Sequence, residues 1–107
     1  MSLNTYNSSN VNFEWDESKR NANINKHQLD FVYAMYVFED TGRIDFIDNR
    51  KEYDEERRIT VGCIEDAVFV VVYTQRSGAI RIISFRSANK KEKTKYYDNK
   101  YDIGRNS

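Results

Sequence analysis

The stretch "EDAVFVVVYTQRSGAIRIISFR", residues 65–86, decides the fold. Its first half is apolar at consecutive positions, which is typical of a strand that is covered on both faces of a sheet. "QRSGA" predicts a turn, because glycine and serine accept the backbone angles that turns require. "AIRIISFR" predicts the next strand. Because the connection is short, we expect the two strands to pair in antiparallel orientation.

Two further runs with a period of two lie upstream of this hairpin. In "RIDFID" the alternation places Ile44 and Phe46 on one face. In "ERRITVGCI" it places Ile59, Val61 and Cys63 on one face. The spacings between the last three strands are short. The four strands are therefore predicted to form an antiparallel meander.

Helices are predicted on both sides of these strands in the sequence. Asp16 suits a helix N-cap, and the first helix is expected to run to about His27. Asp30 suits the cap of a second helix, and Ser87 suits the cap of a final basic helix, "ANKKEKTKYYDNKY". Before the first helix, "NFEW" is either a short strand or an extended lead-in. The second helix has a buried stripe at i, i+3, i+4 and i+7, formed by Phe31, Ala34, Met35 and Phe38.

These elements predict an α+β domain with two N-terminal helices, a four-stranded antiparallel sheet and a C-terminal helix. We expect one domain over residues 12–100, between a disordered tail at 1–11 and a C-terminal tail at 101–107. The apolar runs are far shorter than the roughly 20 residues that span a bilayer, and no signal peptide is visible. Cys63 is the only cysteine, which excludes an internal disulfide and favours a cytoplasmic location.

The charges are unevenly distributed, although the formal net charge is zero. Residues 39–56 hold eight acidic and three basic side chains, whereas residues 81–100 hold seven basic and two acidic ones. A neutral chain can therefore present a basic patch to a nucleic acid. The alternative is that both runs are solvated faces.

The side chains that could carry chemistry indicate acid–base work rather than a metal or another cofactor. With one histidine and one cysteine, a transition-metal site is not expected, and the four glycines form no phosphate-binding loop. Cleavage of RNA without a metal needs a base for the 2′-OH, an acid for the leaving 5′-oxygen and cations for the phosphorane charge. These groups are offered by several arginines and by Lys26, His27, Glu56 and Tyr73.

Each candidate residue also has a structural alternative. His27 lies near the end of the first helix, where a cation complements the helix dipole. Glu56 and Arg57 are adjacent in a strand, so their side chains point to opposite faces and can serve as cross-strand charge partners. Arg81 and Arg86 are five positions apart, which places them on opposite faces of a regular strand unless a bulge intervenes.

Several motifs, taken in order, resemble the BrnT toxins of bacterial type II toxin–antitoxin systems. The motifs are "FEWD" at 13–16, Asn23 with Lys26-His27, Asp30-Phe31, Glu56-Arg57, and "RIIS" at 81–84 followed by Arg86, Ala88, Glu92 and Tyr96. The resemblance covers about residues 13–97. It implies a RelE-like fold and a ribonuclease that inhibits translation. It also implies a DNA-binding BrnA-like antitoxin, encoded by the adjacent gene, as the partner in a hetero-oligomer.

We therefore predict an endoribonuclease that cleaves RNA by metal-independent attack of the 2′-OH. The predicted catalytic residues are His27, Glu56, Arg81 and Arg86. The predicted RNA-binding residues are Lys26, Arg57, Arg76, Lys90 and Lys91. The alternative function is a non-catalytic RNA-binding or antitoxin-binding module of the same fold.

Overall fold

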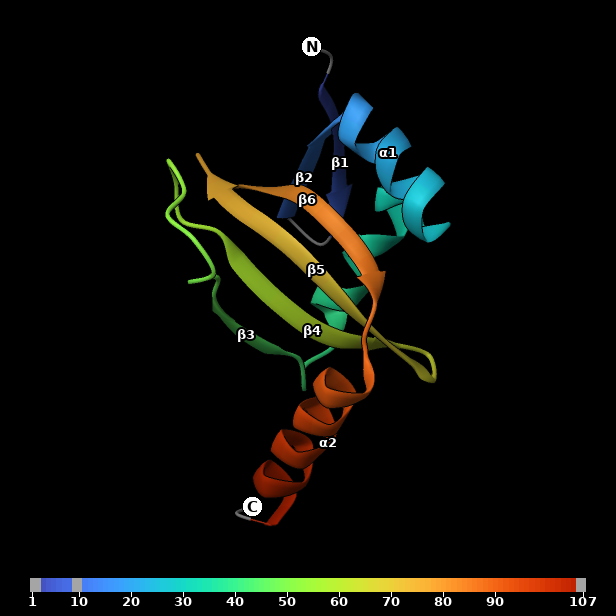
Figure 1. Cartoon of the computed structure of the whole chain (residues 1–107), viewed down its shortest axis with the longest axis vertical. Helices are drawn as coiled ribbons and strands as arrows, with labels where there is room; N and C mark the ends of the chain where they lie inside the picture. Colours follow the sequence, from blue (N-terminus) through green and yellow to red (C-terminus); the bar gives the residue numbers. More distant parts are fainter. Residues whose placement is uncertain (1–2, 9–10, 106–107) are drawn as a thin grey trace.

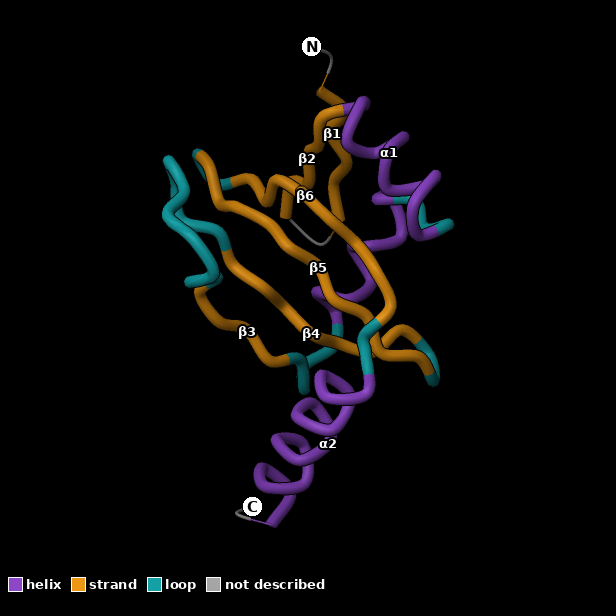
Figure 2. Tube along the Cα trace, viewed as in Figure 1, coloured by secondary structure: helices purple, strands orange, loops and turns teal. Residues whose placement is uncertain are grey.

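The computed structural model describes residues 3–8 and 11–105 (Figures 1 and 2). The six strands of the described residues form one sheet in the order β1-β2-β6-β5-β4-β3. Figure 1 shows the 3₁₀ helix η1 behind this sheet and α2 at its lower end. The elements, in chain order, are β1 (Leu3–Ser8), β2 (Val11–Asp16), α1 (Glu17–His27), η1 (Phe31–Glu39), β3 (Ile44–Ile47), β4 (Arg58–Ile64), β5 (Ala67–Arg76), β6 (Ala79–Ser87) and α2 (Lys90–Arg105).

The sheet is mixed, and it contains the predicted meander as its larger part. Strands β3, β4, β5 and β6 pair in antiparallel orientation with their chain neighbours. Strand β2 then adds to β6 in parallel orientation, with Phe13 opposite Ile80 and Trp15 opposite Ile82. Strand β1 pairs antiparallel with β2.

The predicted order of two N-terminal helices followed by a purely antiparallel four-stranded sheet is therefore wrong. Two strands precede the helices, and one of them makes a parallel pair. The pairing of β2 with β6 joins segments far apart in the sequence, which no local pattern predicts. Strand β1 lies within the segment expected to be a disordered tail, because backbone hydrogen bonds to β2 need no apolar period in β1.

The core on one face of the sheet is closed by η1. Its fully buried residues are Phe31, Ala34 and Val37, whereas Met35 and Phe38 are only partly buried. This spacing of three residues is the period of a 3₁₀ helix, whose side chains eclipse at i and i+3. The predicted stripe assumed the α-helical period of 3.6. It is confirmed at Phe31 and Ala34, it omitted Val37, and its members Met35 and Phe38 pack against the core while remaining only partly buried. We call the sheet face under this helix the η1 face.

Helix α1 is attached to the sheet mainly by a single polar side chain. Asn23 is the buried residue of α1. Its Nδ2 donates to the carbonyl of Phe85 over 2.8 Å, and its Oδ1 accepts from the Phe85 N–H over 3.1 Å. The described register of β2 with β6 stops at Ile82. Asn23 therefore pairs the backbone of β6 just beyond the end of its neighbouring strand, where the edge would otherwise be open.

Helix α2 covers one end of the opposite sheet face. Tyr96 is fully buried in a second core cluster with Val61, Val70 and Ala88, and its hydroxyl donates to Asp40 at the end of η1. We call this second face the α2 face. The larger part of that face, toward β6 and the loop after β3, is not covered by the helix in Figure 1.

The start of α2 is fixed by a capping box. The Glu92 N–H donates to the Asn89 side chain, and the Asn89 N–H donates to the Glu92 carboxylate, each over 2.8 Å. The helix cap is thus Asn89 rather than the predicted Ser87. A glutamate three residues after Asn89 is the sequence signature that the prediction overlooked.

Replacement of Asn23 tests its role in holding α1 against β6. We expect Asn23→Ala to lower the free energy of unfolding, because each buried backbone group left unpaired costs about 1–3 kcal/mol. Urea denaturation followed by circular dichroism measures the change. The exposed Asn25 on the same helix provides the control variant, Asn25→Ala, which should shift the midpoint much less. Equal midpoints for the two variants would contradict this role.

Candidate functional site

A β-bulge brings two of the predicted site arginines to one face. Val72 pairs with Ser84, but Tyr73 pairs with Ile82, so Ile83 is an extra residue in β6. Cross-strand partners point to the same face. Arg86 is opposite Val70, which belongs to the α2-face cluster, and Arg81 is opposite Thr74, the neighbour of the η1-face residue Tyr73. Both arginines therefore lie on the α2 face.

Arg86 is held in place by a carboxylate from α2. Its two terminal nitrogens donate to the two oxygens of Glu92, each over 2.8 Å, and both side chains are about three-quarters buried. The hydrogen bonds within this pair raise the pKa of the Arg86 guanidinium and lower the pKa of the Glu92 carboxyl. Because Glu92 also caps α2, the same carboxylate fixes the start of the helix and the position of the arginine.

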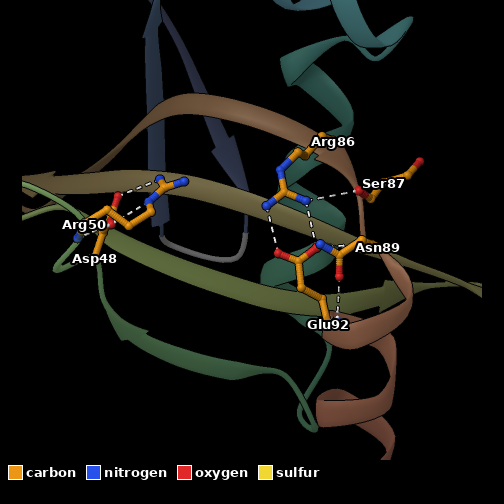
Figure 3. Close-up of polar contacts among 6 residues, drawn as sticks. All are labelled: Asp48, Arg50, Arg86, Ser87, Asn89 and Glu92. Atoms are coloured by element: carbon orange, nitrogen blue, oxygen red, sulfur yellow. Dashed lines mark hydrogen bonds and ion pairs between the residues drawn. The ribbon is translucent and has the colours of Figure 1, made fainter.

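A further arginine, which the sequence analysis did not select, reaches the same face from the loop after β3. Arg50 donates through Nε and Nη2 to the Asp48 carboxylate, each over 2.8 Å, and its side chain is 64% exposed. In Figure 3, Arg50 and Arg86 extend over the sheet from opposite sides. The charge of Arg50 acts on both Arg86 and Glu92.

The buried carboxylate of Asp48 fixes the position of the Arg50 side chain. Its side chain is fully buried, and it also accepts hydrogen bonds from the Tyr53 hydroxyl and the Arg50 N–H, over 3.1 Å each. The hydrogen bonds from the Arg50 side chain hold the pKa of the Asp48 carboxyl far below its usual range. The sequence signal for Arg50 is only an aspartate two residues earlier. The surrounding acidic run concealed it.

Two other predicted RNA-binding arginines belong to the same region. Arg76 forms an ion pair with Glu55, and the Arg57 guanidinium lies 4.1 Å from the centre of the Tyr53 ring. Together with neighbours in the loop they line a polar cleft of about 470 Å³. We use the name arginine face for the part of the α2 face that carries Arg50, Arg57, Arg76, Arg81 and Arg86.

Lys90 and Lys91 extend this positive charge along α2. They are exposed in the first turn of the helix, directly after the Asn89 cap, and they line a shallow hollow on the helix surface with Thr94 and Lys95. The capping box places this turn next to the ion pair of Arg86 with Glu92. The two lysines therefore border the arginine face.

His27 is the last residue of α1 and is partly buried, whereas Lys26 is exposed. Helix α1 packs along β6. His27 follows Asn23 by four residues, which puts both side chains on the same side of the helix. Asn23 binds the backbone of Phe85, the residue before Arg86, and His27 lies about one helical turn beyond this contact.

Glu56 and Tyr73 are not brought to the arginine face. Glu56 is exposed and forms an ion pair with Arg58 over 3.5 Å. Arg58 in turn binds Asp45, which accepts a hydrogen bond from the buried Tyr73 hydroxyl on the η1 face. Burial and the hydrogen bond to Asp45 both raise the pKa of Tyr73. These contacts make Tyr73 part of a structural network.

The structure also bears on metal and membrane binding. Within residues 11–100, whose side chains are described, no cluster of three or more His, Cys, Asp or Glu side chains has the arrangement of a metal site. Cys63 packs against the second core cluster, as predicted. Among the helices of the described part of the chain, none combines the length and apolarity needed to cross a bilayer.

The buried Asp48 predicts a specific dependence of stability on pH. A carboxyl whose pKa is lower in the folded state stabilises the fold above its unfolded pKa of about 3.9, and this contribution is lost as the pH falls toward the folded value. We expect Asp48→Asn to lower the free energy of unfolding at pH 7 by about 1–3 kcal/mol. As the pH falls from about 5 to about 2, the free energy of unfolding should decrease less for the variant than for the wild type, because the variant has no carboxyl to protonate at this position. Denaturant titrations across this range, with the exposed Asp54→Asn as control, measure both effects; parallel pH profiles for wild type and Asp48→Asn would contradict the assignment.

Residues 15–92 match the family described as ribonuclease toxin, BrnT, of type II toxin-antitoxin system. The match runs from β2 to Glu92, and thus includes the bulge in β6 and every arginine of the arginine face. No curated protein matches the chain. Since the match covers well over half of the sequence, the chain belongs to the BrnT family of ribonuclease toxins of type II toxin–antitoxin systems.

Proposed function

We propose that the arginine face binds RNA, and that the chain cleaves the RNA there by metal-independent attack of the 2′-OH on the adjacent phosphate. The observation that carries this proposal is the bulge at Ile83, which puts Arg81 and Arg86 on one face that Arg50 also reaches. Several guanidinium groups on an open surface can contact successive phosphates of a single strand. They can also stabilise the charge that develops on a phosphorane.

The pairing of the carboxylates supports a mechanism without a metal ion. On the arginine face Asp48 is bound by Arg50, Glu55 by Arg76 and Glu92 by Arg86. A hard cation such as Mg²⁺ would have to bind these carboxylates beside guanidinium groups whose charge repels it. The guanidinium groups already supply positive charge where such a metal would supply it.

We assign the acid–base role to His27 and the stabilisation of the phosphorane charge to Arg81 and Arg86. Histidine is the side chain that ordinarily changes protonation near neutral pH. The position of His27 one helical turn beyond the contact of Asn23 with Phe85 supports this role. Glu56 would have to leave its ion pair with Arg58 and cross to the other face. Arg50, Arg57 and Arg76, with Lys26, Lys90 and Lys91, then serve to hold the RNA strand.

The family membership implies an antitoxin partner. We propose that this partner is a BrnA-like DNA-binding protein encoded by the adjacent gene, and that an acidic segment of it masks the arginine face. Complementary charge across an interface gives fast and specific association. Cleavage of RNA in the cytoplasm would then inhibit translation whenever the antitoxin is missing. That the fold is RelE-like remains a prediction from the resemblance.

Removal of Arg86 tests the catalytic use of the arginine face. We expect Arg86→Gln to reduce the cleavage rate by about 10²–10³-fold, the usual loss when one group that stabilises transition-state charge is removed. A fluorescent single-stranded RNA provides the assay. The control is Lys93→Gln, which removes an exposed positive charge from α2 and should change the rate only slightly. Melting temperatures of both variants show whether the fold persists, and a folded Arg86→Gln with the wild-type rate would refute the assignment.

The ends of the RNA products test the mechanism. Attack by the 2′-OH leaves a 2′,3′-cyclic phosphate or a 3′-phosphate on one product and a 5′-hydroxyl on the other, and EDTA should not stop the reaction. We expect His27→Ala to be slower by about 10²–10⁴-fold, as for the loss of a general acid or base. Products with a 5′-phosphate, or inhibition by EDTA, would indicate metal-dependent hydrolysis instead. Full RNA binding without any cleavage would favour the alternative of a non-catalytic binding module.

A further inference from the structure

The arginine face contains a second anion-binding site that the chain fills with its own carboxylate. We propose that Arg57, Arg76 and Arg81 form a site for an RNA phosphate, and that Glu55 occupies this site until RNA displaces it. The inference rests on the proposed function, because it assumes that RNA binds to the arginine face. It adds a second phosphate position next to the scissile phosphate, which is assigned to Arg81 and Arg86, and a competitor that belongs to the protein; Arg81 borders both positions.

The first observation is the manner in which Glu55 is held. Arg76 donates to both of its oxygens, from Nε over 2.7 Å and from Nη2. Arginine binds both carboxylate and phosphate groups in this bidentate geometry. The side chains of Arg76 and Glu55 are 48% and 37% exposed. The pair is therefore accessible to a competing anion from solution.

The second observation is that Glu55 lies in the field of all three arginines. The hydrogen bond from Arg76 lowers the pKa of the Glu55 carboxyl, and the charges of Arg81 and Arg57 lower it further. The strands explain why these residues come together. Glu55, Arg57 and Arg76 line one cleft, and Arg81, opposite Thr74, lies on the same face of the β5–β6 hairpin as Arg76.

The third observation is a hydroxyl group without a partner. Thr74 is fully buried beside Arg81, and its Oγ1 is a buried side-chain oxygen with no hydrogen-bond partner among the described residues. Leaving such a group unpaired is unfavourable by about 1–3 kcal/mol. Thr74 therefore places an unpaired hydroxyl on the same face as Arg81, directly across the pairing of β5 with β6.

The shapes of the two anions explain why phosphate would win. A carboxylate has two oxygens in one plane, and Arg76 engages both of those of Glu55. A tetrahedral phosphate that binds Arg76 in the same way still has oxygens that point toward Arg57 and Arg81. An exposed ion pair is weak in water, since its charges are solvated and screened. RNA can therefore replace Glu55 at low cost, and the contacts with the other two arginines favour the exchange.

The test uses the full chain and a short single-stranded RNA with 2′-O-methyl groups, which binds but cannot be cleaved by its own 2′-oxygen. Fluorescence anisotropy gives the dissociation constant of the wild type, of Glu55→Gln and of the control Glu52→Gln, at several salt concentrations. Both substitutions remove one negative charge from the same loop, so a general effect of net charge appears in both variants.

We expect Glu55→Gln to bind about 2- to 5-fold more tightly than the wild type at low salt, the range that corresponds to one exposed ion pair. The slope of the logarithm of its affinity against the logarithm of the salt concentration should be steeper by about 0.7. The reason is that arginines freed from Glu55 now release counterions when RNA binds. Glu52→Gln should keep the wild-type slope. In an Arg76→Gln background, the gain from Glu55→Gln should disappear.

The outcomes separate this inference from the proposed function. If RNA binds neither the wild type nor the variants, the arginine face is not an RNA site, and the proposed function is refuted together with this inference. If RNA binds the wild type in a salt-dependent manner but Glu55→Gln and Glu52→Gln behave alike, the face binds RNA and the inference is overturned. A melting temperature that drops for Glu55→Gln without any gain in affinity would show that the ion pair is only structural.

Discussion

The extra residue in β6 is the constraint on which the site depends. Without Ile83 as a bulge, strand alternation would send Arg81 and Arg86 to opposite faces, one of them under η1. Bulges bend a strand and interrupt its ladder, and β6 is held from both edges around its bulge. β5 supplies one edge, and Asn23 supplies the other by binding the Phe85 backbone where β2 has ended. The fold of the N-terminal half thus serves the geometry of the arginines.

The arginines themselves are positioned by carboxylates rather than by burial. Glu92 holds Arg86 and Asp48 holds Arg50, but the two pairs differ in character. The Asp48 carboxylate is fully buried while its partner Arg50 is 64% exposed, whereas Arg86 and Glu92 are both about three-quarters buried. Such pairing keeps like charges close together in the free protein. It also leaves hydrogen-bonding groups ready for phosphate.

The sequence predicted those parts of the structure that depend on local patterns. The meander from β3 to β6 follows from alternation and short turns, and it was correct. The parallel pairing of β2 was missed because its partner strand is distant in the chain. The period of η1 was misread, since Phe38 fits an α-helical stripe and only the structure shows the spacing of three. Arg50 was not predicted because it lies within the acidic segment 39–56. The sequence does predict that Arg81 and Arg86 share a face only if a bulge intervenes, and the structure has that bulge.

Helix α2 links the arginine face to the other side of the sheet. Its first turn is fixed by Glu92 to Arg86, and one turn further on its buried Tyr96 donates to Asp40, where η1 ends. Burial acts to raise the pKa of the Asp40 carboxyl, but hydrogen bonds from Tyr96 and from the backbone of Cys63 and Gly42 outweigh it and keep this group ionised. Helix α2 is therefore held to the arginine face through Glu92, to β5 through the Ala88 N–H, which donates to the Val68 carbonyl over 2.9 Å, and to the core through Tyr96. The residue that caps the helix and the residue that orients Arg86 are thus joined in one rigid end of the sheet.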